Sequence, residues 1–440
     1  MTRQTRLVLA GTAAALVAAV SLVGGVLRDS GGTARAVPLK ASPAGGAFEV
    51  GFAAGDTATF VRRLTAELRM HPASAKGYTL LGLAYQQRAR ETGNPAYYTK
   101  SEQALLRART LAPKDASTTS ALGSLALARH RFQDAFLLGR SAVRLAPYTA
   151  RNYGVLGDSL VELGRYREAF RAFDRMGSIR PDLSSYSRIS YARELLGRPD
   201  AAEQAMKLAL DAAGGQPEPT AWVQTQLGKL AWSRGQLHEA EAHFRAATAV
   251  FPGYVYALEP LAKVEEAKGN HRAALSLARR AAQVLPLPQT VATLGDLYAR
   301  HGRDRAAARQ YALVGAIERL LVANGVRTDL EAALFDVDHG IRIGRAVAHA
   351  RQARRARPSI DGDDVLAWAL VRDGRCVEAL PYSRRALRLG TRDALKLFHR
   401  GMIERCLGHD GEARSWFEQA LRLNPHFSLL WSPVARKYAS

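Results

Sequence analysis

The sequence predicts an all-α solenoid built from about ten helix–turn–helix repeats, and three observations support this prediction. First, prolines that follow helical segments recur at intervals of 34 residues. Second, the segment before each of these prolines is rich in alanine and ends in a similar way, as in ARTLAP, AVRLAP and AAQVLP. Third, a Leu-Gly pair lies near the middle of the preceding segment, as in VLGDSL and QLGKLA. The spaced prolines are Pro113, Pro147 and Pro181, followed by Pro252 and Pro286.

A pair of helices accounts for each part of the repeated pattern. The small residue of the first helix and the alanines of the second lie where neighbouring helices approach closely. A glycine between the helices permits the left-handed turn that ends the first helix, and the proline stops the second. Because one repeat cannot bury its apolar face alone, the repeats are expected to stack into a superhelix with a concave groove.

This pattern resembles the tetratricopeptide repeat, whose unit has the same length and the same two helices. The resemblance is most detailed over residues 227–252, 294–311 and 401–425. It implies a right-handed superhelix in which the first helices line the concave groove and the second helices form the convex face. It also implies a non-enzymatic scaffold for a peptide or protein partner, with no catalytic residues and no cofactor.

The chain divides into five expected segments. Residues 1–36 are predicted to be a signal peptide or signal anchor, 37–56 a linker, 57–72 a leading helix, 73–425 the repeat solenoid, and 426–440 a C-terminal cap. The repeats therefore form most of the chain, and the remaining segments either deliver the solenoid or close its ends.

The N-terminal segment has the features of an export signal. Arg3 and Arg6 precede an uncharged apolar run at 7–27, and positive charge before such a run keeps that end inside the cell. The run is close to spanning length, which favours a retained anchor, whereas Ala34-Arg35-Ala36 offers a cleavage site. In both cases we expect membrane insertion, at least transiently. The solenoid is then either secreted or held in the cell envelope by an anchor in the cytoplasmic membrane.

The chain carries a formal charge of +22, and most of it is assigned to the second helices. The densest group lies on the helix expected at 342–358, where Arg351, Arg354 and Arg355 share a face. Two interpretations remain open for this convex charge. It is either the ordinary solvated face of an arginine-rich protein or a surface for anionic cell-envelope polymer or lipid headgroups. Nucleic acid is disfavoured as a partner, because basic and aromatic residues do not alternate on any one element.

The groove-facing positions of the first helices carry more acids than bases. These positions, taken from the resemblance, also hold several aromatic residues. Together they predict a concave binding surface for a partner with basic and apolar character. The predicted groove residues are Asp158, Tyr191, Glu194, Trp232, Glu266, Asp296, Phe335, Asp338 and Trp368.

One short motif could indicate a serine hydrolase. Gly157-Asp158-Ser159-Leu160 matches the nucleophile block of the GDSL esterases, and Asp336 and His339 match a second block. However, a nucleophile of this type needs a turn after a strand, whereas LGDSL occupies the helix-packing register of the repeat. We therefore predict that Gly157 is a packing residue and that Ser159 is not catalytic.

Two patterns could indicate metal sites, but neither fits. In HEAEAH, His238 and His243 are five residues apart, which places them on different faces of a helix. Asp361, Asp363 and Asp364 lack the spacing and the downstream glutamate of a calcium loop, and they lie where a helix is expected to begin. No metal site is predicted.

The only two cysteines, Cys376 and Cys406, are predicted to form a disulfide. Both lie two residues from a turn glycine, in adjacent repeats whose helices should pack together. Export would place them where thiols are oxidised. The alternative is a pair of small buried thiols that fill helix contacts.

Overall fold

The computed structural model describes residues 57–440, so the predicted signal segment and linker, residues 1–36 and 37–56, lie outside the described residues. Over the described range every regular element is an α-helix. A leading helix, α3 (Thr57–Met70), precedes ten consecutive helix pairs, and α24 (Trp431–Ala439) follows them. The chain is thus the all-α solenoid that the sequence predicts, with ten repeats.

In each pair the first helix carries an even number and the second an odd one. The pairs are α4 (Ala75–Thr92) with α5 (Ala96–Leu111), α6 (Ala116–Ala128) with α7 (Phe132–Leu145), α8 (Ala150–Glu162) with α9 (Tyr166–Ile179), α10 (Leu183–Leu195) with α11 (Pro199–Asp211), α12 (Pro217–Ser233) with α13 (Leu237–Val250), α14 (Val255–Ala267) with α15 (His271–Val284), α16 (Pro288–Arg300) with α17 (Asp304–Ala323), α18 (Asp329–Asp338) with α19 (Ile343–Ala356), α20 (Ile360–Arg372) with α21 (Cys376–Ala386), and α22 (Ala394–Cys406) with α23 (Asp410–Leu423).

The glycine of the first helix and an aromatic residue of the second pack together within a pair. A Cβ atom on Gly157 would overlap the ring of Phe173, which is itself only 1% exposed. The same contact joins Gly228 to Phe244, where a Cβ would lie 2.5 Å from the ring. The predicted role of the Leu-Gly pair is therefore confirmed: the glycine provides room for an aromatic ring from the partner helix.

The predicted helix ends are also observed. Gly164 follows α8 with φ of +68°, a left-handed conformation that suits glycine because it has no Cβ. Helix α5 ends at Leu111, two residues before Pro113, and α7 ends at Leu145, two residues before Pro147. The ring of proline fixes φ and removes the N–H that a further helical turn would need.

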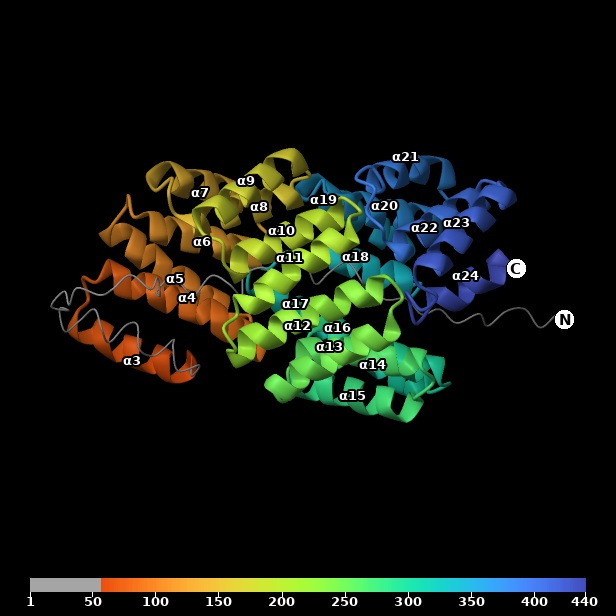
Figure 1. Ribbon diagram of the computed structural model, residues 1–440, viewed down its shortest axis with the longest axis horizontal. Helices are drawn as coiled ribbons and strands as arrows, with labels where there is room; N and C mark the ends of the chain where they lie inside the picture. Colours follow the sequence, from red (N-terminus) through yellow and green to blue (C-terminus); the bar gives the residue numbers. More distant parts are fainter. Residues whose placement is uncertain (1–56) are drawn as a thin grey trace.

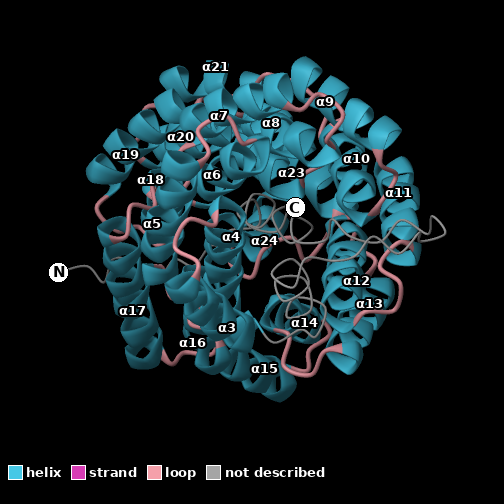
Figure 2. Ribbon diagram, turned by 90° about the vertical axis from the view of Figure 1, so that its left-hand side faces the viewer, coloured by secondary structure: helices cyan, strands magenta, loops and turns pink. Residues whose placement is uncertain are grey.

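The ten pairs wind into a right-handed superhelix that forms a ring when viewed along its axis (Figure 2). First helices such as α12, α14 and α16 lie towards the centre of this ring, and α13, α15 and α17 lie at its rim. Burial follows the same division, since nearly every residue of α20 is buried whereas α21 buries only four residues. The first helices therefore provide the inner face and the second helices the outer face.

Successive turns of the superhelix touch each other along what we call the inter-turn seam (Figure 1). In the seam, the mid-repeat turns of the first five repeats contact the loops that follow repeats six to ten. Four hydrogen bonds across it join residues separated by 192 to 196 positions in the chain. They are Arg357 to Glu162, Ile360 N–H to Tyr166 Oη, Thr391 to Leu195 O, and Asn424 to Trp232 O. One superhelical turn therefore takes between five and six repeats.

Glycines let the backbones approach closely at this seam. A Cβ on Gly164 would overlap the carbonyl oxygen of Pro358, and one on Gly197 would overlap that of Gly390. Both glycines also have φ near +67°, so each serves the turn and the contact at once. The seam consequently depends on main-chain geometry as well as on side-chain bonds.

Cys376 and Cys406 form a disulfide, as the sequence predicts, with their Cα atoms 6.0 Å apart. The bond joins the first residue of α21 to the last residue of α22, so it ties the ninth repeat to the tenth. Among the described residues, 57–440, no helix combines the length and the apolar character needed to cross a bilayer.

Candidate functional site

The nine predicted groove residues all lie on first helices. Asp158 is on α8, and Tyr191 and Glu194 are on α10. The others follow in chain order: Trp232 on α12, Glu266 on α14, Asp296 on α16, Phe335 and Asp338 on α18, and Trp368 on α20. Their surroundings divide them into two groups, one engaged in contacts between repeats and one partly open.

Most of the acids bond to the first helix of the next repeat. Asp158 is 6% exposed and accepts two hydrogen bonds from the Arg188 guanidinium on α10, at 2.9 and 2.7 Å. Arg188 is itself 2% exposed, so this is a buried, bidentate ion pair between consecutive repeats. Burial nevertheless raises the pKa of Asp158, against the opposing effect of Arg188.

Equivalent contacts recur along the superhelix, and we call them the inter-repeat ladder. Each rung joins an acid on one first helix to a donor on or just after the next. The rungs are Asp158–Arg188, Glu259–Thr293, Glu266–Arg300, Asp296–His339, Asp338–Trp368 and Asp364–His399.

The rung at Asp296 is fully enclosed. Asp296 Oδ1 accepts from Tyr311 Oη at 3.1 Å and lies 2.9 Å from His339 Nε2. Phe335 packs against the rings of both Tyr311 and His339, with centroids 5.8 and 4.2 Å away. Asp296 is 0% exposed, so the prediction that it contacts a ligand is wrong, because side chains of its own repeat and of the next repeat enclose it.

The rung at Asp338 corrects two further predictions. Trp368 is 0% exposed, and its indole N–H donates to Asp338 Oδ1 at 2.8 Å. The indole of Trp431 donates to the same oxygen at 3.0 Å, and the ring of His399 stacks on Trp368 at 4.4 Å. Burial raises the pKa of Asp338 to about 6. Asp338 and Trp368 are therefore core residues of the C-terminal repeats and not ligand contacts.

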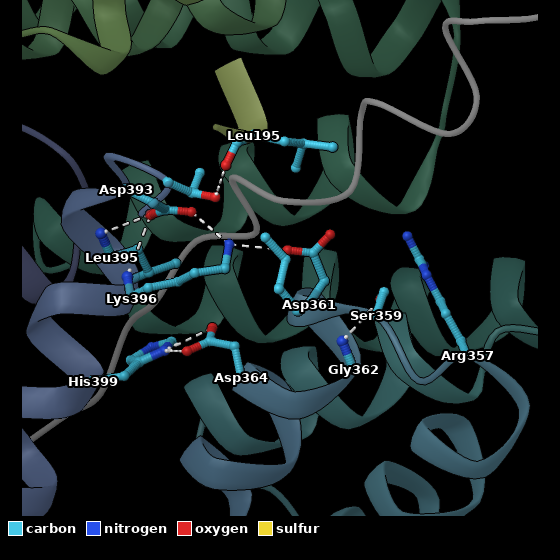
Figure 3. A network of polar contacts seen from close by, with 12 residues as sticks. Leu195, Arg357, Ser359, Asp361, Gly362, Asp364, Asp393, Leu395, Lys396 and His399 are labelled. Atoms are coloured by element: carbon cyan, nitrogen blue, oxygen red, sulfur yellow. Dashed lines mark hydrogen bonds and ion pairs between the residues drawn. The ribbon is translucent and has the colours of Figure 1, made fainter. Parts of the chain in front are cut away.

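A denser network joins α20 to α22 (Figure 3). Lys396 is 4% exposed and forms ion pairs with Asp361 at 2.9 Å and Asp393 at 2.6 Å. One turn further along, Asp364 lies 3.0 Å from His399 Nδ1. Across the inter-turn seam, the Thr391 hydroxyl donates to the carbonyl oxygen of Leu195, which is labelled in Figure 3. The network holds the loop between α21 and α22 against both its own repeat and the previous superhelical turn.

The acid excess of the groove therefore has a structural cause. The groove acids at Asp158, Glu266, Asp296 and Asp338 are 6% exposed or less, and each has a partner from an adjoining repeat. The inference of a basic partner, which rested on this excess, is consequently not supported by the structure. The sequence contains a signal for these contacts, because the acid and its partner are 30 to 43 residues apart, which is close to the length of one repeat.

The second group of predicted residues remains partly open. Tyr191, Glu194, Trp232 and Phe335 are half-buried, and the first three cluster on α10 and α12. Burial, with Asp393 nearby, raises the pKa of Glu194 to about 7. Lys229, which is not among the predicted groove residues, lies on the same helix as Trp232. Its Nζ is buried without a hydrogen-bond partner, and burial lowers its pKa to about 8.

A cavity of about 310 Å³ opens at the seam beside this group. Its lining includes Arg234, Arg392 and Arg422, together with Asp200, which pairs with Arg234 at 3.0 Å. A smaller hollow shares Arg234 and Arg392 with it and reaches Glu194 on the inner face. The seam therefore has a basic recess that leads towards the half-buried group.

Comparison with known proteins identifies the repeat. Residues 225–286, from the middle of α12 to just beyond the end of α15, match the model of the tetratricopeptide repeat family. Helix pairs continue from α4 to α23, on both sides of the matched segment. Residues 225–286 therefore belong to the tetratricopeptide repeat family, and the described residues, 57–440, have a solenoid fold of paired helices.

Solved structures with similar folds include several tetratricopeptide proteins. The human IFIT1 dimer with m7Gppp-AAAA is 13% identical, covering 92% of this chain and 93% of that chain, with a TM-score of 0.48. TTC0263 of Thermus thermophilus is 22% identical, covering 43% and 98%, with a TM-score of 0.39. Pseudomonas aeruginosa pilF is 18% identical, covering 48% and 92%, with a TM-score of 0.36. These similarities concern the fold alone, and a comparison with curated proteins finds no match.

On the outer face of the solenoid, part of the predicted basic patch is engaged in ion pairs. Arg351 forms an ion pair with Glu378 at 2.6 Å, and Arg354 forms one with Asp363 at 3.1 Å. Of the predicted basic patch only Arg355 is exposed. Two of the three arginines of the predicted basic convex patch therefore form ion pairs with neighbouring helices.

The hydrolase motif is part of the repeat packing, as predicted. Ser159 is 0% exposed within α8, and its hydroxyl donates to Leu156 O at 2.7 Å. Of the second block, His339 contacts Asp296, and Asp336 pairs with Arg342 at 2.9 Å. A buried helical hydroxyl bonded to its own main chain cannot reach an acyl substrate.

We expect Ser159→Ala to leave the hydrolysis of a short acyl ester at the rate of buffer alone, as in the unaltered chain. Loss of one intrahelical hydrogen bond should lower the free energy of unfolding by about 0.5–1 kcal/mol. The measurements are a chromogenic ester assay and urea denaturation. Hydrolysis above the buffer rate that disappears in Ser159→Ala would contradict this account.

Neither of the two sequence patterns that were considered as metal sites brings metal ligands together in the structure. His243 Nδ1 contacts Gln224 at 2.7 Å. At the start of α20, Asp361 pairs with Lys396 and Asp363 with Arg354, while Asp364 bonds to His399. The three aspartates thus hold basic side chains of the solenoid.

Proposed function

We propose that this protein is a non-enzymatic scaffold that binds a segment of a partner protein on its inner face. The observation that carries the proposal is the half-buried group on α10 and α12. Tyr191 and Trp232 are half-buried, and the buried Nζ of Lys229 makes no hydrogen bond. An unsatisfied buried donor costs roughly 1–3 kcal/mol, so a bound partner that supplies an acceptor would recover this free energy.

The chemistry of this group favours a partner rich in acceptors. Arg151 Nε and Nη2 on α8 are also buried without partners, and burial lowers the pKa of Arg151 to about 10. The adjoining recess adds Arg234 and Arg392. Carboxylates or main-chain carbonyls of an extended segment would satisfy these donors, while apolar side chains would cover the two aromatic rings. The partner that we propose is therefore acidic or neutral, whereas the sequence predicts a basic one.

The proposed location is the outer side of the cytoplasmic membrane. It is supported by Arg3 and Arg6 before the apolar run at 7–27. A disulfide between the only two cysteines is in keeping with an oxidising compartment.

An alternative function is binding of anionic envelope polymer or lipid headgroups through the outer face. Its supporting observations are the charge of +22 and exposed arginines such as Arg355 and Arg280 on the second helices. Such binding would weaken steeply as salt is added, because it depends on screened charges. Binding that involves aromatic contacts on the inner face would depend on salt far less.

Trp232→Ala is expected to weaken capture of a crosslinked partner about 5–30-fold, the loss typical of an aromatic anchor worth about 1–2 kcal/mol. Trp416→Ala is the matched control, because Trp416 is half-buried on the outer helix α23. Binding would be measured by quantitative pull-down at low and high salt. Equal losses in the two variants would contradict the proposal, and loss only on addition of salt would favour the outer-face alternative.

A further inference from the structure

We infer that the adjacent turns after α14 and α16 form a binding site for a zinc-type divalent cation, held by Glu266, His271 and His301. The three residues come from consecutive repeats. Glu266 is in the last turn of α14, His271 is the first residue of α15, and His301 caps α16. One ligand atom from each lies within 4.8 Å of the others. Two imidazoles with one carboxylate is a ligand set that zinc adopts at open sites.

The distances at this cluster are close to those of a coordinated cation. Glu266 Oε2 lies 3.0 Å from His271 Nδ1 and 3.2 Å from His301 Nε2. Tetrahedral zinc with ligand bonds of about 2.0–2.1 Å separates its ligand atoms by about 3.3 Å. The two imidazole rings are 4.7 Å apart at 62°, so both present a ring nitrogen to the same carboxylate oxygen. The two ring nitrogens lie within 4.8 Å of each other, so rotation of the imidazoles towards one another would bring all three ligand atoms to coordination distance.

Outer contacts already fix the carboxylate. The second oxygen of Glu266 accepts from Arg300 Nε at 2.8 Å, and Arg300 also donates to Leu429 O at 3.0 Å. Burial alone would raise the pKa of Glu266, but the hydrogen bonds from both histidines and Arg300 lower it. Groups that orient a ligand in this way are a regular feature of metal sites. The positive charge of Arg300 opposes the cation, so affinity should be weaker than at a four-ligand site.

Access to the cluster is open from solvent. The side chain of His271 is 52% exposed and that of His301 is 25% exposed, whereas Glu266 is 2% exposed. Three protein ligands leave a fourth position for water or for a group from another molecule. The cation would also tie the sixth repeat to the seventh, beside the existing Glu266–Arg300 rung of the inter-repeat ladder.

A second cluster of possible ligands in the same chain provides a comparison for the proposed site. Glu404, His409 and Glu412 also lie within 4.8 Å of one another in the last repeat, but they include a single histidine. His409 is half-exposed, and Glu412 is exposed. A cation with a preference for nitrogen ligands should select the cluster with two imidazoles.

The test is titration of the full chain, free of affinity-tag histidines and previously treated with chelator, with Zn²⁺ by calorimetry. We expect one saturable equivalent. His271→Ala and His301→Ala should each weaken it by more than about 100-fold, the upper range for loss of an outer-shell group. His409→Ala should leave it unchanged. With Co²⁺ as the probe, the absorption of tetrahedral coordination should appear in the unaltered chain and in His409→Ala only.

Circular dichroism of each variant controls for folding. Should an alanine variant lose helicity, His301→Gln keeps a donor for Glu266 while weakening metal ligation, and it is expected to lose Zn²⁺ binding with the fold intact. Absence of a saturable equivalent, equal binding by all variants, or loss confined to His409→Ala would each overturn the inference.

Discussion

Trp368→Ala is expected to lower the free energy of unfolding by about 3–5 kcal/mol, the usual cost of truncating a fully buried tryptophan. The indole is 0% exposed, and it lies between the rings of His399 and Trp431, at 4.4 and 5.2 Å. Its removal would leave a cavity at the contact between α20, α22 and the C-terminal cap. It would also deprive Asp338 of one of its two indole hydrogen bonds.

Urea denaturation followed by circular dichroism measures this effect, with hydrogen exchange to locate it in α18–α24. Trp416→Ala is the control, because this half-buried tryptophan on the outer face should cost far less. If Trp368→Ala left stability within about 1 kcal/mol of the unaltered chain and instead impaired partner capture, Trp368 would be a ligand residue after all.

Arg357→Ala is expected to cost about 3–5 kcal/mol as well, because it leaves buried acids without their partner. Arg357 is 5% exposed, and it bonds to Glu162 across the inter-turn seam and to Glu331 at 3.2 Å. Burial raises the pKa of Glu162 to about 7, with Arg357 opposing the rise, so this carboxyl already bears a large desolvation cost. Without Arg357 the seam should open locally.

Stability and hydrogen exchange at residues 162–166 and 357–360 would report this opening. Arg422→Ala removes an ion pair with Glu418 in which both side chains are exposed, 65% and 43%, and it should cost less than about 1 kcal/mol. Equal effects of the two substitutions, or unchanged exchange at the seam in Arg357→Ala, would show that the seam contact does not hold the superhelical turns together.

The local fold could be predicted from the sequence because each signal acts within one repeat. The contact of Gly157 with Phe173 and the turn at Gly164 both follow from a pattern that recurs every 34 residues. The disulfide could be predicted for a related reason, since Cys376 and Cys406 lie at equivalent turn edges of adjacent repeats.

The inter-turn seam could not be predicted in this way. Contacts such as Tyr166 with Ile360 depend on how far each repeat rotates relative to the last, and this small angle accumulates over more than five repeats. No residue pattern within a single repeat encodes that angle. The sequence pattern therefore predicts only a turn at Gly164, and the close contact of this glycine with Pro358 is visible only in the structure.

The groove was predicted correctly in position and partly wrongly in role. The register placed Asp296 and Trp368 on the inner side of first helices, which is where they lie. Register does not give the distance to the next helix, and that distance decides whether an inward side chain meets a ligand or a neighbour. For these two residues the neighbouring repeat is close enough to enclose them.

The most direct test of the proposed function is site-specific photocrosslinking of the full chain in its own cells. A photoreactive residue at position 232 would lie on the inner face, and one at position 355 would lie on the outer face. We predict a discrete protein adduct from position 232 and none from position 355. An adduct from position 355 alone, or the same products from both positions, would contradict binding on the inner face.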